Sequence, residues 1–173
     1  NKKLAADVRI EVLAERTSGF SGADLESLLN EAAILTARKN ETEITQASAL
    51  KALEKVMIGP ERKSHLHTEQ ERKITAYHEA GHALVASLLP DADPVHKITI
   101  VPHGHSGGYT MKLPLEERRL LPRKTYLDDL AMSLGGYATE HMVFGDVTTG
   151  PSHDLQVATR LARSMVARWG MSD

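Results

Sequence analysis

The stretch AYHEAGHALVASLLP, residues 76–90, decides the architecture of the second half of this chain. It carries His78, Glu79 and His82 inside a run of otherwise mostly small or apolar residues. A capping-box pattern before it and a proline at its end predict one continuous helix over 68–89. Two imidazoles and a carboxylate on neighbouring positions of an apolar helix require an explanation, and their spacing offers one.

The spacing of the two histidines favours a zinc site. Residues four apart lie one turn apart on the same helix face, so His78 and His82 can bind one metal ion. Glu79 lies about 100° around the helix from His78 and can reach a water on that metal without being a ligand. Such a site suits amide hydrolysis, in which zinc lowers the pKa of water to about 7 and the glutamate transfers its proton to the leaving nitrogen. The alternative is an amphipathic helix with two ordinary histidines. Gly81 and the apolar flanking residues favour the zinc site.

A catalytic zinc site also needs a third protein ligand, and the chain has no cysteine to provide it. The metzincin spacing would require histidine at position 88, where this chain has Leu88, and that class is excluded. The downstream candidates are Glu140, His141, His153 and Asp154. Asp154 comes just before the apolar stripe of the last predicted helix, so its carboxylate can point inward. Imidazole is an equally good zinc ligand, and spacing alone does not choose between the candidates.

The composition is that of a soluble globular protein, with 41% hydrophobic and 25% charged residues in 173. The net charge of −2 gives no broad basic surface, so we expect no nucleic-acid partner. The longest apolar run, residues 83–89, is far shorter than the roughly 20 residues of a membrane span. We therefore expect the chain itself to be soluble.

A polar segment divides the chain into two predicted modules. The first module should be all helical, because three segments combine capping residues with apolar residues at helical spacing: residues 8–17, 21–39 and 45–58. We expect this module to occupy residues 1–60 and a linker to occupy 61–67. The second module then covers 68–173.

The second module is predicted to be helical with one short β-hairpin. Two β-branched, alternating segments, residues 96–102 and 107–113, flank a glycine-rich turn and predict the hairpin. A helix is expected over 125–144, where Gly135 and Gly136 indicate close packing or a break. A last helix over 152–169 carries apolar residues that we expect to be core. The predicted fold class is therefore mainly α with a small sheet.

Four stretches resemble the FtsH family of membrane-anchored, ATP-dependent AAA+ zinc metalloproteases. They are GFSGADLESLLNEAAILTAR, AYHEAGHALVASLLPDADPVHKITIVP, LGGYATEHMVFG and TTGPSHDLQVATRLARSMVARWGMSD. The resemblance covers nearly the whole chain and implies a helical AAA+ lid followed by a zincin-like peptidase domain that is incomplete at its C-terminus. It further implies that His78, His82 and Asp154 bind Zn²⁺ and that Glu79 is the catalytic base.

This chain departs from the family pattern at three positions. His153 stands where the family usually has asparagine, so an imidazole lies beside the expected ligand and could replace or support it. Tyr137 replaces an arginine, and His141 replaces a glutamate. Glu140 is retained, and we interpret it as supporting a ligand or the fold rather than binding the metal.

The lid resemblance places Gly22 and Ala23 beside the adenine of a bound nucleotide. The alternative is a helix start that needs small residues, which would be sufficient to explain both. The chain contains no G-x-x-x-x-G-K-[ST] phosphate-binding loop, so ATP and Mg²⁺ are expected only with the full-length protein.

Two functions follow as hypotheses. The first is the zinc endopeptidase portion of an ATP-driven protease that degrades unfolded and membrane proteins. By resemblance, we expect the parent protein to be a homo-hexamer. Its membrane anchor is expected in an N-terminal part missing from this chain, and the part described by this sequence is expected on the cytoplasmic side. The second is a non-catalytic assembly module built on the same scaffold. A scaffold has no physical need to keep the motif residues and Asp154, which weighs against the second hypothesis.

Overall fold

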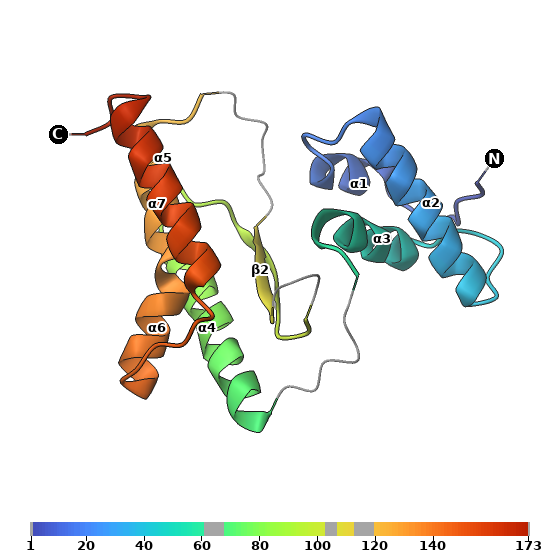
Figure 1. Cartoon of the computed structure of the whole chain (residues 1–173). Helices are drawn as coiled ribbons and strands as arrows, with labels where there is room; N and C mark the ends of the chain where they lie inside the picture. The colour runs from blue at the N-terminus through green and yellow to red at the C-terminus, as the bar shows by residue number, and fades with distance from the viewer. Residues whose placement is uncertain (1, 61–67, 103–106, 113–119, 173) are drawn as a thin grey trace. The chain divides into compact units, whose positions relative to one another are not determined.

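The structure is a computed structural model that describes residues 2–60, 68–102, 107–112 and 120–172. The described residues form two compact units, here called the N-terminal unit (2–60) and the C-terminal unit (68–172 with the gaps just given). The predicted linker 61–67 lies outside the described residues. Both units are mainly helical, which confirms the predicted fold class (Figure 1). Within the described ranges, no helix combines the length and the apolar character needed to cross a membrane.

The N-terminal unit has the three predicted helices, α1 (Ile10–Arg16), α2 (Gly22–Arg38) and α3 (Gln46–Ile58). Helix α2 begins with a capping box, in which Ser21 and Asp24 each bind the other's backbone N–H. Helix α3 begins at the predicted Thr45 cap. Helices α2 and α3 pack together over a core of small and aliphatic side chains: Leu28, Ala32, Ile44, Ala49, Ala52 and Leu53.

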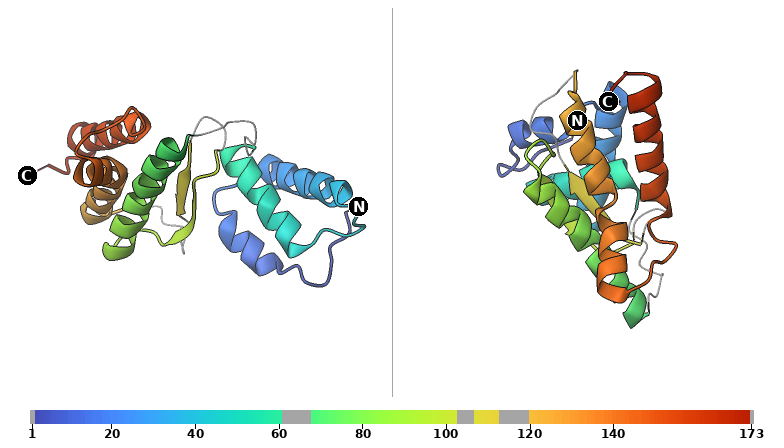
Figure 2. Two further views of the ribbon diagram at one scale, coloured as in Figure 1. Left: turned by 90° about the horizontal axis from the view of Figure 1, so that it is seen from below. Right: turned by 90° about the vertical axis from the view of Figure 1, so that its left-hand side faces the viewer.

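The C-terminal unit is built around one long helix. Its elements are α4 (Glu69–Leu88), β1 (Val95–Thr99), β2 (Tyr109–Lys112), α5 (Arg123–Ser133), α6 (Gly135–Phe144) and α7 (Ser152–Ala167). The two strands pair antiparallel, as predicted. Helix α4 contacts both strands as well as α5 and α6, and α7 packs on α5. Figure 2 shows α4 between the hairpin on one side and the later helices on the other.

Helix α4 begins and ends as the sequence predicts. Thr68 and Glu71 form a capping box with each other, and the helix ends at Leu88, two residues before Pro90. Because both sides of α4 are covered, the helix buries its polar motif together with small residues: His78, Glu79, Gly81, His82, Ala83 and Ala86.

The single helix predicted over 125–144 is wrong, because the chain breaks at Leu134 into α5 and α6. The break lies beside a close contact between α6 and α4. A Cβ on Gly135 would lie 2.9 Å from the carbonyl oxygen of Gly81, and a Cβ on Gly81 would lie 2.2 Å from Thr139 Oγ1. The glycines therefore mark both a break and a close helix crossing, the two alternatives that the sequence left open.

The apolar stripe of the last helix is only partly core, which corrects the sequence prediction. Ala158 and Met165 are buried, whereas Leu155 is 40%, Val166 60% and Trp169 45% exposed. Among the described elements, α7 makes its main contact with α5 alone. One neighbouring helix covers only part of an apolar stripe this wide, so periodicity indicated the helix correctly but overestimated its burial.

Candidate metal centre

Three ligand atoms from two helices converge in the C-terminal unit. His78 and His82 extend from the same face of α4, and their Nε2 atoms are 3.0 Å apart. Asp154, in the first turn of α7, places its Oδ2 atom 3.2 Å from Nε2 of His78 and 3.5 Å from Nε2 of His82. The two histidines are buried and Asp154 is half-buried. These residues form a group that can hold a metal ion.

The other nitrogen of each imidazole has a separate partner. Nδ1 of His82 lies 2.7 Å from the carbonyl oxygen of Met132, and Nδ1 of His78 lies 2.8 Å from Glu140 Oε1. A carbonyl oxygen only accepts hydrogen bonds, and so does an ionised carboxylate, so both Nδ1 atoms are assigned as donors. In the neutral rings, both Nε2 atoms then carry lone pairs that face each other and the Asp154 carboxylate. Three acceptors so arranged can bind one cation between them.

The distances and the donor set fit zinc. Two imidazole nitrogens and one carboxylate oxygen form a known catalytic ligand set for zinc, and ligands about 2.0–2.1 Å from a tetrahedral ion are about 3.4 Å from each other. The three separations here, 3.0, 3.2 and 3.5 Å, scatter around that value. Ligating histidines commonly donate their second N–H to a carboxylate or a backbone carbonyl, and both arrangements occur here.

The electrostatics of the group also favour a positive charge at its centre. Burial alone would lower the pKa of His78, but hydrogen bonds to Asp154 and Glu140 outweigh it and raise this pKa above its ordinary value. Burial would likewise raise the pKa of Asp154, but hydrogen bonds to His78 and His82 lower it well below the usual range. The site therefore stabilises imidazolium beside carboxylate, and a divalent cation satisfies the same requirement.

Glu140 contacts both the candidate ligand His78 and the segment that precedes the candidate ligand Asp154. It is 1% exposed, and its Oε1 accepts the hydrogen bond from His78. Its Oε2 accepts from the backbone N–H of Thr148 at 2.8 Å and from the Thr148 hydroxyl at 2.9 Å. Thr148 lies six residues before Asp154. The structure thus places Glu140 beside the converging group, with hydrogen bonds to His78 and to Thr148 in the segment before α7.

Gly136 forms the wall behind the His78 ring. A Cβ at this position would lie 2.4–2.6 Å from three atoms of the imidazole, Cε1, Nε2 and Nδ1. Real Cβ atoms essentially never come this close, so any other residue at position 136 would require the imidazole ring or α6 to move. Sequence reasoning noticed the glycine pair but missed its partner, because the partner depends on how α6 crosses α4.

Glu79 lies on another side of α4, facing the hairpin. It is 6% exposed, and burial raises its pKa while a hydrogen bond from Thr110 opposes the rise. Thr110 lies on β2, where it pairs with Ile98 of β1. Its hydroxyl is 2.8 Å from Glu79 Oε2. Sequence reasoning missed Thr110. The alternating pattern predicted the hairpin, but not which of its residues contacts Glu79.

The remaining predicted residues do not belong to the converging group. His153 and His141 are both exposed, and neither joins the three ligand atoms. Gly22 and Ala23 are exposed at the first turn of α2. A Cβ added to Gly22 would meet nothing within 4 Å. Packing among the described residues therefore does not require glycine at this helix start.

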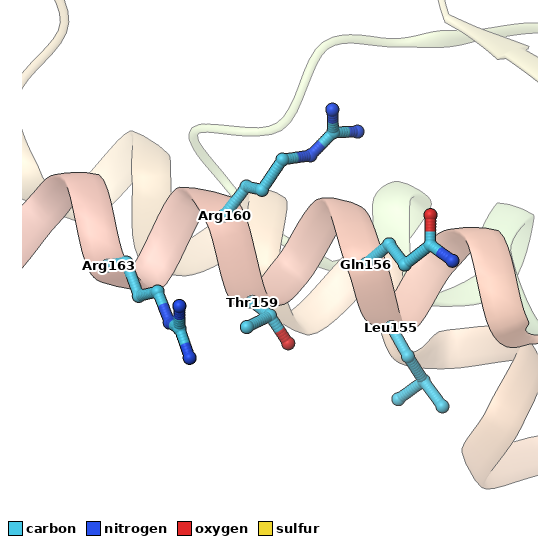
Figure 3. A pocket seen from close by; sticks show the side chains of 5 residues that line it. All are labelled: Leu155, Gln156, Thr159, Arg160 and Arg163. Atoms are coloured by element: carbon cyan, nitrogen blue, oxygen red, sulfur yellow. The ribbon is translucent and has the colours of Figure 1, made fainter.

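A pocket on α7 is distinct from the metal centre. It has a volume of about 390 Å³, and Figure 3 shows the side chains that line it, all from α7: Leu155, Gln156, Thr159, Arg160 and Arg163. None of them is a histidine or a carboxylate, so this pocket offers no metal ligand. The predicted chemistry therefore belongs to the groups around α4.

The His-Glu-x-x-His helix, with a carboxylate supplied by a later helix, defines the class of zinc-dependent metallopeptidases. Comparison with family models agrees, because residues 65–173 match the model of peptidase family M41 and residues 7–52 match an AAA+ lid domain. The chain belongs to peptidase family M41.

Three relatives are similar to the chain over nearly all of its length. The chain is 54% identical over its whole length to an ATP-dependent zinc metalloprotease FtsH of Veillonella parvula, of which it covers 27%. It is 52% identical over 99% of its length to the protein of that name from Rubrobacter xylanophilus, covering 26% of it. It is 50% identical over its whole length to an ATP-dependent zinc metalloprotease FtsH of Thermotoga maritima, of which it covers 28%. The chain therefore spans about a quarter of the length of these relatives.

Proposed function

We propose that this chain is the lid and a large part of the peptidase domain of an ATP-dependent zinc metalloendopeptidase. The observation that carries the proposal is the convergence of two imidazole Nε2 atoms and one carboxylate oxygen within 3.5 Å of one another. Their lone pairs face inward, because the Nδ1 atoms are occupied by other partners. Domain bounds of 1–60 and 68–173 are part of the proposal.

In the proposed site, His78, His82 and Asp154 hold the zinc ion. Zinc supplies the Lewis acidity that activates a water molecule and polarises a peptide carbonyl. Glu79 takes a proton from the attacking water and returns it to the leaving nitrogen. Its burial favours this role, because a raised pKa brings a carboxylate closer to the pH at which it must both accept and release a proton.

The whole protein is proposed to act as its relatives are named. It would couple ATP hydrolysis, in a part outside this chain, to the degradation of unfolded and membrane proteins. A homo-hexamer, an upstream membrane anchor and a cytoplasmic location of this part belong to the same proposal, as does a position of Gly22 and Ala23 beside adenine. The net charge of −2 offers no reason to add a nucleic-acid partner.

Metal content and proteolysis of the full-length protein test the proposal together. We expect about one zinc per chain, lost in His78→Ala and Asp154→Ala, with His153→Ala as the control that keeps it. Glu79→Gln should keep the metal but abolish cleavage of an unfolded protein. Zinc retained in Asp154→Ala but lost in His153→Ala would overturn the ligand assignment. A wild-type protein without zinc would overturn the proposed enzymatic function. The hypothesis of a non-catalytic assembly module would then remain, although no feature of the metal centre favours it.

A further inference from the structure

The hydroxyl of Thr110 is the hydrogen-bond donor described at the Glu79 carboxylate. Thr110 Oγ1 lies 2.8 Å from Glu79 Oε2 and 3.0 Å from the main-chain carbonyl oxygen of the same glutamate. A carboxylate with 6% exposure loses most of its hydration, so a protein donor at hydrogen-bond distance matters more here than at the surface.

This contact fixes the glutamate side chain relative to its own backbone. One hydroxyl touches both the carboxylate and the carbonyl of Glu79, so the side chain cannot rotate away without losing its donor. The other carboxylate oxygen is also confined, because a Cβ on Gly108 would come within 3.1 Å of Glu79 Oε1. The segment that includes β2 therefore borders both oxygens of the carboxylate, one with a hydrogen bond and one with a glycine.

The strand that carries Thr110 is itself held in register. Thr110 pairs with Ile98, and its neighbour Met111 pairs with Lys97 and is buried. A slip by one residue would turn Thr110 to the opposite face of the sheet. The backbone that carries the Thr110 hydroxyl is therefore fixed by strand pairing.

We propose that Thr110 is a positioning residue that orients the Glu79 carboxylate for proton transfer. The inference rests on the proposed function, in which Glu79 is the base. A hydroxyl suits the task because it can donate as well as accept, so it can keep a contact with Glu79 before and after the proton moves. An amide N–H or an apolar side chain lacks this property.

The test is steady-state cleavage of an unfolded protein by the full-length, zinc-loaded enzyme carrying Thr110→Val, which keeps the β-branched shape but removes the hydroxyl. We expect kcat to fall by about 10- to 100-fold, the usual consequence of misplacing a catalytic group, with KM within about twofold and zinc content unchanged. Thr110→Ser keeps the hydroxyl and should retain at least about half of the wild-type kcat.

Thr125→Val is the matched control. Thr125 is also buried in the C-terminal unit, but its hydroxyl has no hydrogen-bond partner among the described residues, so its removal should leave kcat unchanged. If Thr110→Val fails to fold, Thr110→Ala takes its place and should have a kcat about tenfold below that of Thr110→Ser.

Three outcomes would overturn the inference: a kcat of Thr110→Val within twofold of wild type, equal activities of the serine and alanine variants, or an equal loss in Thr125→Val. Each presumes an active wild-type enzyme. A wild-type protein that binds zinc but cleaves nothing would instead count against the proposed function, so the two failures are distinguishable.

Discussion

The two units of this chain bury different kinds of side chains. The N-terminal unit has an ordinary core, in which α2 and α3 contribute to a cluster of Ala32, Ile44, Ala49 and Ala52. The C-terminal unit buries two histidines and two glutamates, and Glu140 is among the largest fully buried side chains of the described residues. Among its described residues, the buried apolar side chains are few: Ala83, Ala86, Met111, Pro151, Ala158 and Met165.

From this difference we infer which unit a bound ligand would stabilise. Apolar burial stabilises a unit whatever is bound, at about 25 cal/mol per Å². Buried imidazoles and carboxylates are costly unless they are paired, and three of the C-terminal unit's polar groups face one another with lone pairs. We therefore expect the stability of the C-terminal unit, but not of the N-terminal unit, to depend on zinc.

Zinc removal should produce the largest effect. At free zinc about 1,000-fold above the dissociation constant, binding stabilises the folded unit by about 4 kcal/mol. Chelation in the full-length protein should remove this contribution and speed amide exchange in α4 by up to about 1,000-fold where global opening governs exchange. Hydrogen-exchange mass spectrometry with and without chelator measures it.

Peptides from α2 and α3 provide the internal control for that experiment. Their protection should not change on chelation, and added zinc should restore α4. If α2 and α4 lost protection equally, or if α4 lost none, the proposed contrast between the two units would be wrong.

The second-largest effect is expected from a substitution of Gly136 in the C-terminal unit, for which Gly22 in the N-terminal unit provides the control. Gly136→Ala places a Cβ within 2.4 Å of His78, so the ring must move or α6 must shift away from α4. Overpacking of this kind costs about 1–3 kcal/mol, although glycine-to-alanine in a helix interior is normally favourable by up to about 1 kcal/mol. We expect lower stability and weaker zinc binding, measured by chemical denaturation of the full-length protein and by competition with a chelating dye.

Gly22→Ala is the matched control in the N-terminal unit. Gly22 is the first residue of α2, and a Cβ there meets nothing within 4 Å. This substitution should change stability by less than about 0.5 kcal/mol and leave zinc affinity unaltered. Equal destabilisation by the two substitutions would show that the close approach of Gly136 to the His78 ring does not limit the residue at position 136.

Local signals made most of the fold predictable. The starts of α2, α3 and α4 depend on hydrogen bonds between residues three apart, so Ser21, Thr45 and Thr68 identify them without knowledge of the rest. The break at Leu134 and the exposure of Val166 depend on which element lies opposite. A one-dimensional pattern carries that information only weakly.

The candidate site also combines features that depend on residues close in sequence with features that depend on packing between distant elements. His78, Glu79 and His82 lie within one helical turn, so their geometry follows from spacing alone. Asp154 comes from a separate helix, and only the family resemblance selected it from the candidates. Thr110 escaped detection because its place depends on strand register, which the sequence did not specify.

The smallest predicted effect compares a fully buried carboxylate, Glu140, with a partly buried one, Glu31. Glu140→Gln replaces two acceptor oxygens by one, yet His78 and the backbone N–H of Thr148 both need an acceptor there. Loss of such support to a metal ligand typically weakens binding by 10- to 100-fold, so we expect zinc affinity to fall by about that factor.

Glu31 in the N-terminal unit provides the control. It pairs with Lys55, and the two side chains are 17% and 34% exposed. Glu31→Gln should cost less than about 1 kcal/mol and leave zinc affinity unchanged. Titration with a zinc indicator measures the affinities, and thermal unfolding measures the stabilities. If Glu140→Gln bound zinc as tightly as Glu31→Gln, orientation of His78 by Glu140 would have no role, and His78 would be held by Gly136 and the metal alone.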